Sequence, residues 1–220
     1  MPELFTDRRQ GLSLTPFDSF NLALHVGDDE VSVRANRALL AAKIGPTQFM
    51  NQVHGDAFKV VESVSDIDPT CDALITTTQG IALAVMIADC IPLLLISKSV
   101  VAAVHVGRKG LYNGIAVKVV AEMKRLGAAD IHATLGASIC GRCYEVSQEI
   151  QDEVCAKYPD AFALTREHTP ALDLSRALIT ILVDLGVSYE ASSTCTLEDP
   201  LYFSYRRHNI TGRNAGVVWL

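Results

Sequence analysis

Two reactive side chains stand at the ends of one predicted hairpin. Residues 93–96 and 100–104 are short apolar runs joined by the polar turn 97–99, which is typical of two buried antiparallel strands. Cys90 lies just before the first run and His105 just after the second. A hairpin brings its two ends together, so we expect Cys90 and His105 to be neighbours. A cysteine beside a histidine is either a nucleophile with its base or a pair of ligands for a soft metal.

A second histidine can join this pair. His54 follows the plausible strand 48–53 and precedes Gly55, a position where active-site loops begin. Two imidazoles and one thiolate match the ligand set of catalytic zinc, which keeps a fourth position open. Such a zinc ion would activate water or polarise a substrate oxygen. Without a metal, Cys90 activated by His105 favours acyl-type hydrolysis, and Asp89 could orient a histidine or face solvent.

Other metal sites fit the sequence less well. A cytidine-deaminase zinc site requires H-x-E together with P-C-x-x-C, and no histidine here precedes a glutamate by two positions. A multicopper oxidase needs many clustered histidines, whereas this chain has six in all. We therefore do not expect copper oxidase activity.

Composition limits the class of protein. The chain has 220 residues, of which 49% are hydrophobic, with no linker-like stretch, so we expect a single domain over residues 1–220. A net charge of -6 disfavours nucleic-acid binding. No leader-like or membrane-spanning stretch is apparent, which predicts a cytoplasmic protein in which the six cysteines are thiols or ligands. Composition leaves the oligomeric state open, and an oligomer is compatible with it.

Helical spacing predicts several helices around the hairpin. One follows the capping pair Asp28-Asp29, carries Val31, Ala35, Leu39 and Ala42 on one face, and ends at Gly45. A second covers 111–126, and others begin near 146 and after Asp173. Between them, Cys140 and Cys143 form a C-x-x-C that could be a redox pair or half of a zinc site, although no second C-x-x-C exists. Cys195 is interpreted as a packing residue.

The end of the chain combines aromatic and basic residues. The segment 202–208 reads Y-F-S-Y-R-R-H, and a final strand is predicted at 215–220. Aromatic rings beside arginine can hold a nucleoside or a phosphate. The same pattern also fits an edge strand with solvated ends, and the sequence does not decide between the two.

Several motifs in a fixed order resemble the laccase-domain family, also called the polyphenol oxidase or purine nucleoside phosphorylase family. The motifs are residues 51–55 (N-Q-V-H-G), 72–76 (D-A-L-I-T), 88–92 (A-D-C-I-P), 105–107 (H-V-G), 143–146 (C-Y-E-V) and 202–207 (Y-F-S-Y-R-R). The resemblance implies an α+β fold, a four-layer α/β/β/α sandwich with mixed β-sheets that is cysteine-hydrolase-like. It also implies zinc (Zn2+) held by His54, Cys90 and His105, the same three residues that their chemistry singled out.

The activity implied by the resemblance is phosphorolysis of purine nucleosides. The family's substrates are adenosine, guanosine, inosine and methylthioadenosine, with adenosine deamination in addition. Candidate phosphate contacts are Arg9, Arg108, Lys109 and Arg206, and candidate nucleoside contacts are Gln52 and Tyr205. The chain departs from the family's H-A-G-W-R-G, which here reads H-V-G-R-K-G, so the stacking tryptophan is replaced by Arg108 and a forked arginine by Lys109.

Two alternative functions stay open at this point. The first is a metal-free Cys90/His105 hydrolase or amidase that edits peptidoglycan precursors, an activity linked to some bacterial members of the family. The second is a non-catalytic scaffold that carries zinc.

Overall fold

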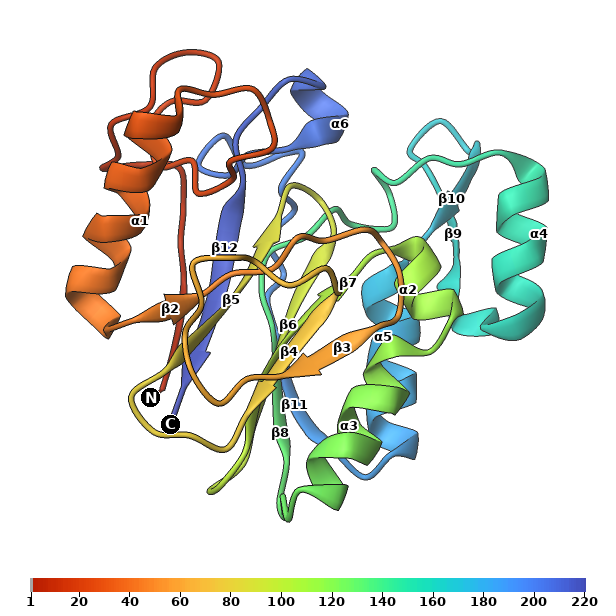
Figure 1. Ribbon diagram of the computed structural model, residues 1–220. Helices are drawn as coiled ribbons and strands as arrows, with labels where there is room; N and C mark the ends of the chain where they lie inside the picture. The colour runs from red at the N-terminus through yellow and green to blue at the C-terminus, as the bar shows by residue number, and fades with distance from the viewer. Residues whose placement is uncertain (1) are drawn as a thin grey trace.

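Two mixed β-sheets lie face to face in the computed structural model, which describes residues 2–220, and helices cover both outer faces (Figure 1). The four-stranded sheet has the order β1 (Glu3–Phe5), β12 (Asn214–Trp219), β5 (Ala82–Ile87), β2 (Thr47–Gln48). The six-stranded sheet has the order β11 (Ser188–Ala191), β8 (His132–Leu135), β6 (Ile91–Ile96), β7 (Val101–Val106), β4 (Ala73–Thr76), β3 (Phe58–Val60).

The helices complete four layers. Helix α1 (Glu30–Ile44) lies outside the four-stranded sheet, and α3 (Ile115–Arg125) and α5 (Leu174–Asp184) lie outside the six-stranded sheet (Figure 1). The remaining elements are α2 (Arg108–Tyr112), α4 (Gln148–Lys157), η1 (Pro159–Ala161), β9 (Phe162–Leu164), β10 (Pro170–Leu172) and α6 (Tyr205–His208). No helix among residues 2–220 is long and apolar enough to cross a membrane.

Alternating side chains divide the interior into three apolar layers. Along β5, Leu83 and Val85 face the second sheet, whereas Ala82 and Ala84 face the layer under α1. Along β7, Ala103 faces the layer between the sheets, and its neighbours face α3 and α5. Because these strands are buried on both faces, their sequences are continuous apolar runs. The predicted α+β four-layer α/β/β/α sandwich is confirmed.

The predicted buried face of α1 is wrong. Asp29 does cap the helix by accepting from the Ser32 amide, and Gly45 ends it with φ 93°. Val31 and Leu39, however, are 75% and 42% exposed. The inward face instead carries Val33, Leu40 and the buried Asn36.

One further expectation needs correction, and one alternative that the sequence left open is decided. The helix predicted over 111–126 is broken into α2 and α3 at Gly114, whose φ of 78° an ordinary side chain rarely adopts. The C-terminal segment 202–208 is not an edge strand, because Tyr205–His208 form the short helix α6, capped by the Ser204 side chain. Its residues Tyr205 and Arg206 line the same pocket as Cys90 and His105 at the hairpin end.

Candidate active site and metal centre

Three sequence-distant side chains meet at one end of the sheets. Pro92 of β6 pairs with His105 of β7, so Cys90, which precedes β6 directly, lies beside His105 as the hairpin predicts. His105 belongs to the strand itself rather than following it. His54 comes from the loop after β2, and its ring packs edge-on against that of His105 with centroids 4.7 Å apart. The ligand atoms of His54, Cys90 and His105 all lie within 4.8 Å of one another.

A buried carboxylate fixes both histidines. Asp72, at the start of β4, is fully buried and lies 2.8 Å from Nδ1 of His105. It also accepts backbone N–H groups from Val53, His54 and Gly55, at 3.3, 2.9 and 2.7 Å. These three consecutive amides form an anion-binding concavity, which holds His54 at its unusual φ of 59°. Asp72 therefore positions the imidazole of His105 and the backbone of His54 together.

Asp89 does not take the role considered for it. Its carboxylate accepts from the Thr196 hydroxyl and from the Arg206 amide, both at 2.7 Å. It therefore neither orients a histidine nor points to solvent, and instead joins Cys90's loop to the C-terminal segments.

Sequence reasoning missed Asp72 as a site residue because its partner His105 is 33 positions away.

Glycine at position 107 leaves space for the three side chains. A β-carbon added there would lie 3.1 Å from Cys90 Sγ and 3.2 Å from Cδ2 of His54. The backbone of Gly107 has φ -88°, which any residue can adopt. Position 107 thus requires glycine because a side chain would crowd Cys90 and His54, and not because of its backbone conformation.

Cys90 and His105 stabilise each other's charged form. Burial by itself raises the pKa of Cys90, but the charge of His105 and hydrogen bonding to His105 and His54 lower the pKa to about 6. Burial lowers the pKa of His105, and the Cys90 thiolate and the Asp72 hydrogen bond outweigh this effect and raise the pKa to about 9. Without a metal, a thiolate–imidazolium pair is therefore the stable state near neutral pH.

This pairing predicts a distinct pH profile for alkylation of the metal-free protein. Iodoacetamide should modify Cys90 at close to its maximal rate at about pH 7, because the thiolate persists above its pKa of about 6. As the pH falls through about 6, the thiolate is protonated and the rate should drop. Cys155 is an internal control, because burial raises its pKa above the ordinary value. Peptide mass spectrometry measures both rates, and a Cys90 midpoint as high as that of Cys155 would contradict the ion pair.

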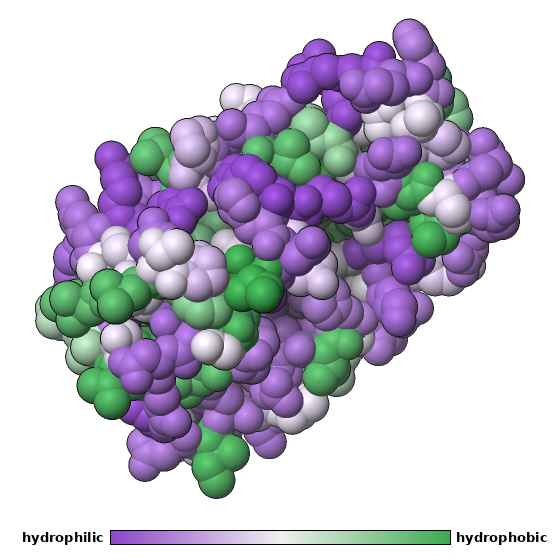
Figure 2. Space-filling model, turned by 90° about the horizontal axis from the view of Figure 1, so that it is seen from above, coloured by the Kyte–Doolittle hydropathy of each residue, from purple (hydrophilic) through white to green (hydrophobic). Residues whose placement is uncertain are grey.

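The three side chains open into a pocket of about 590 Å³. Seen from above, mostly polar side chains surround a hollow near the middle of this end of the molecule (Figure 2). Five of the predicted substrate contacts line the pocket, namely Gln52, Arg108, Lys109, Tyr205 and Arg206. Gln52 is already engaged there, because its side chain bonds both the amide and the carbonyl of Met86.

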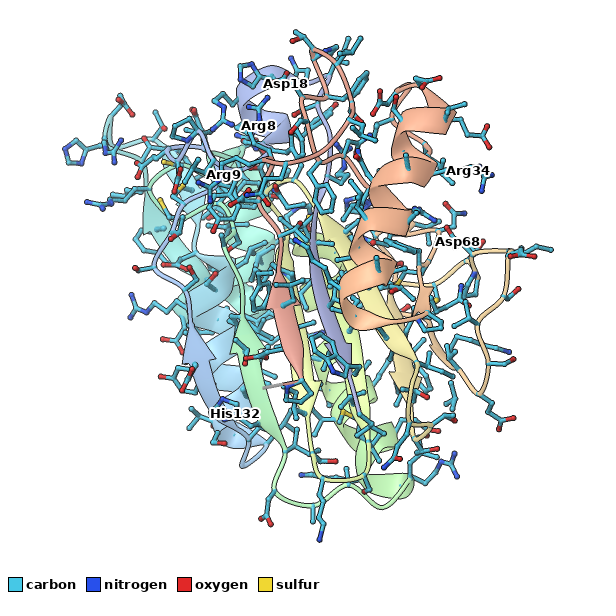
Figure 3. All side chains as sticks on the ribbon, turned by 90° about the vertical axis from the view of Figure 1, so that its left-hand side faces the viewer. Arg8, Arg9, Asp18, Arg34, Asp68 and His132 are labelled. Atoms are coloured by element: carbon cyan, nitrogen blue, oxygen red, sulfur yellow. The ribbon has the colours of Figure 1, made fainter. Side chains whose placement is uncertain are left out.

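Arg9 is the predicted contact that the structure does not bring to the pocket. Its guanidinium bonds the Asp7 carboxylate, at 3.0 Å from Nε. Figure 3 shows it with Arg8 and Asp18 on the N-terminal arm. A phosphate contact for Arg9 stays a prediction that would require this arm to move.

Three pocket residues were not singled out from the sequence. Tyr144 follows the C-x-x-C, and the Arg206 guanidinium lies 5.2 Å from its ring centroid. Arg213 and His25 complete the wall. Tyr144 belongs to the C-Y-E-V motif and Arg213 to the turn before β12, so the motif and the basic C-terminal segment 202–213 were the available signals. With Arg108, Lys109 and Arg206, Arg213 makes the pocket a concentration of positive charge in a chain of net charge -6.

The donor set fits a zinc ion. Two imidazole nitrogens and a thiolate are typical zinc ligands, and the three ligand atoms lie within 4.8 Å of one another. The Asp72 bond to Nδ1 of His105 leaves Nε2 as the free ring nitrogen, which is the arrangement that orients metal-binding histidines in general. A zinc ion held by these three residues would belong to the open class, in which a substrate or water can take the fourth position.

The chain belongs to the multi-copper polyphenol oxidoreductase laccase family, whose sequence model matches residues 2–220. The chain is 44% identical to a purine nucleoside phosphorylase of Corynebacterium glutamicum, over 99% of this chain and 94% of that protein. It is 46% identical to one of Streptomyces coelicolor, over 98% and 94%. These relatives support an enzyme of this kind.

Solved structures show the same fold. YlmD from Geobacillus stearothermophilus superposes with a TM-score of 0.89 at 30% identity, covering 99% of this chain and 92% of that one. A Neisseria meningitidis protein superposes with a TM-score of 0.88 at 33% identity, covering 99% and 93%.

Proposed function

We propose that the chain is a zinc-dependent purine nucleoside phosphorylase acting on adenosine, guanosine, inosine and methylthioadenosine, with adenosine deamination in addition. The observation that carries the proposal is the position of an open His54–Cys90–His105 site on the wall of a pocket lined by Arg108, Lys109, Arg206 and Arg213. The names of the relatives agree with this chemistry. The cation that fits best is zinc, for the donor set given above.

Phosphorolysis requires the pocket to hold phosphate beside C1′ of the ribose and to bind the purine base. A phosphate oxygen forms a bond to C1′ of the ribose while the bond from C1′ to the purine nitrogen breaks, and the purine leaves with the bonding electron pair. Arg108, Lys109, Arg206 and Arg213 would hold the phosphate dianion near the sugar, and the rings of Tyr144 and Tyr205 offer surfaces on which a base can stack. When bound, a zinc ion supplies a Lewis acid that polarises a substrate oxygen.

Phosphate dependence tests this proposal. Purified protein with inosine should release hypoxanthine and ribose 1-phosphate in equal amounts in phosphate buffer, and release should cease in a phosphate-free buffer of equal ionic strength. The same protein with adenosine should yield adenine with phosphate, and inosine by deamination. Hypoxanthine release that is independent of phosphate would point to hydrolysis, and no turnover of any of the four nucleosides by zinc-loaded protein would overturn the assignment.

A second candidate is a metal-free thiol hydrolase. The specific observation in its favour is the chain of contacts from Asp72 through His105 to the thiolate of Cys90, which has the logic of a catalytic triad. In this candidate Cys90 would attack an acyl carbon such as that of a cell-wall precursor amide. Zinc decides between the two: a hydrolase would be inhibited by added zinc and active after chelation, whereas the phosphorylase would lose activity on chelation and regain it with zinc.

A further inference from the structure

A second group of sulfur and oxygen ligands lies outside the pocket. Cys140 and Cys143 come from the loop after β8, and Cys195 and Glu198 from the segment between β11 and α6. One ligand atom from each of the four lies within 4.8 Å of all the others. Cys195 is buried, the other two cysteines are half-buried, and Glu198 is exposed. Apart from the pocket site, this is the one such group among the described residues 2–220.

Both contributing segments are tight turns with the same spacing. The amides of Cys143 and Tyr144 donate to the Cys140 carbonyl, at 2.9 and 3.0 Å. In the other segment the amides of Glu198 and Asp199 donate to the Cys195 carbonyl, at 3.1 and 2.9 Å. The C-x-x-C therefore has a counterpart in C-x-x-E, and each turn presents its first and fourth residues on one side.

The backbone already joins the two turns. Ser138 forms a parallel bridge with Cys195, and the Cys140 amide donates to Cys195 Sγ at 3.4 Å. Cys143 Sγ lies 3.2 Å from the Glu198 carboxylate. In a tetrahedral zinc site with bonds of about 2.3 Å to sulfur, neighbouring sulfurs lie about 3.8 Å apart. Ligand atoms within 4.8 Å of one another thus need only small shifts to close around an ion.

We propose that Cys140, Cys143, Cys195 and Glu198 bind a second zinc ion, in a closed site separate from the pocket. Three sulfurs select a thiophilic metal rather than magnesium or calcium, and four protein ligands are the mark of a structural zinc site. Three thiolates and a carboxylate bring more negative charge than one Zn2+ neutralises. Arg166, which bonds the Glu198 carboxylate, supplies positive charge at the rim.

The alternative use of these cysteines is redox chemistry. All six cysteines of the chain are free thiols in this structure. A C-x-x-C redox pair requires only its own two thiols. Here the ligand atoms of Cys195 and Glu198 also lie within 4.8 Å of those of Cys140 and Cys143, and this four-residue convergence favours the metal site over the redox pair.

The proposed ion would brace the wall of the active pocket. Tyr144, next to Cys143, lines that pocket. Thr196, next to Cys195, donates to Asp89 beside Cys90. Arg207 bonds the carbonyls of Thr196 and Leu197, at 2.9 Å each, and so ties the C-x-x-E turn to α6. The four ligands are therefore positioning residues, which act on the pocket through Tyr144, Asp89 and α6.

Metal counting on the full chain tests this site independently of any activity. Protein purified under reducing conditions and loaded with zinc should hold two zinc ions per chain by elemental analysis. Cys143→Ser and Cys90→Ala should each hold one, and the double variant none. Cys155→Ser is the matched control and should keep two, because Cys155 lies on α4 away from both ligand groups.

Cobalt gives a signature specific to the thiolates. Cys90→Ala loaded with Co2+ should show strong thiolate-to-cobalt charge transfer, and the further change Cys143→Ser should weaken it. If the serine variant does not fold, Glu198→Gln leaves all three thiols in place and should weaken zinc binding at this site at least tenfold.

Three results would overturn the second site. They are one zinc ion in the wild type with none in Cys90→Ala, an unchanged zinc affinity in Glu198→Gln, or a Cys140–Cys143 disulfide that persists in zinc-loaded protein. Two bound zinc ions without nucleoside turnover would uphold the site while the proposed function fails.

Discussion

Replacing Cys90 with alanine is expected to abolish phosphorolysis and to remove one zinc ion per chain while the protein stays folded. In the proposed site the thiolate is one of three protein ligands among residues 2–220, so His54 and His105 alone would leave the ion weakly held. Loss of a group that merely orients a ligand costs about 10- to 100-fold in metal affinity or activity. Loss of the ligand itself should exceed that range. Inosine turnover, zinc content and circular dichroism together measure the effect.

Cys71→Ala is a matched control for this variant. Cys71 is a buried cysteine next to Asp72, so the change also removes a sulfur from the interior near the site. It should leave zinc content and turnover near those of the wild type, because Cys71 belongs to neither ligand group. Equal turnover by Cys90→Ala and the wild type would show that the pocket site does not carry the reaction.

The convergence of Cys90 and His105 was predictable because it depends only on local chain geometry. Two apolar runs joined by a three-residue polar turn can pair in few ways, and the hairpin forms with Leu93 opposite Val104. His54 is different, since nothing in its neighbourhood shows which strand end it approaches. Its inclusion depended on ligand chemistry and on the motif resemblance, and the parallel pairing of β2 with β5 is what places its loop.

Asp72 shows where sequence reasoning failed at the site. Asp89, the carboxylate next to Cys90 in the sequence, was considered as the partner of a histidine. Neighbouring residues at the end of a strand point in different directions, however. The true partner, Asp72, directly precedes β4, which pairs with β7 so that Ala73 lies opposite Val104. That pairing is a property of the whole sheet, which a local pattern does not contain.

The buried face of α1 was mistaken for a related reason. Helical spacing selected apolar residues, whereas the side facing inward must also satisfy the backbone of the N-terminal arm. The amide of Asn36 donates to the carbonyls of Ser19 and Asn21, and its oxygen accepts from the Leu12 amide. Arg37 donates to the Leu22 carbonyl and stacks 3.8 Å from the Phe49 ring centroid. An irregular arm packed on a helix thus requires polar residues inside, which reverses the usual pattern.

The second ligand group, Cys140, Cys143, Cys195 and Glu198, could not be found from the sequence either, because it too depends on long-range pairing. A search for a second C-x-x-C found none, because the partner turn ends in a glutamate. The tertiary fold brings the two turns together through the Ser138–Cys195 bridge and the bond from the Cys140 amide to Cys195 Sγ, across more than fifty positions of the sequence.

Asp72→Asn should lower the zinc affinity of the pocket site by about 10- to 100-fold, the usual effect of removing a group that orients a metal-binding histidine. Each carboxylate oxygen of Asp72 now accepts two N–H groups: one bonds His54 and His105, and the other bonds Val53 and Gly55. An asparagine amide can replace one oxygen, but its NH2 group then faces the donors of the other. Each buried donor left without an acceptor costs about 1–3 kcal/mol, so the free energy of unfolding should fall as well.

Competition with a chromophoric zinc chelator measures the affinity of Asp72→Asn, and urea denaturation measures its stability. Asp56→Asn is the control, because Asp56 lies two residues from His54 and pairs with the exposed Lys118. Such a surface pair contributes at most about 1 kcal/mol, so this change should leave zinc binding unaltered. Burial raises the pKa of Asp72, but the bond to His105 and the backbone amides together outweigh burial and lower it, so the carboxylate stays charged throughout the assay at neutral pH. Wild-type zinc affinity in Asp72→Asn would therefore mean that His54 and His105 reach the metal without this carboxylate, and that their orientation comes from the surrounding strands alone.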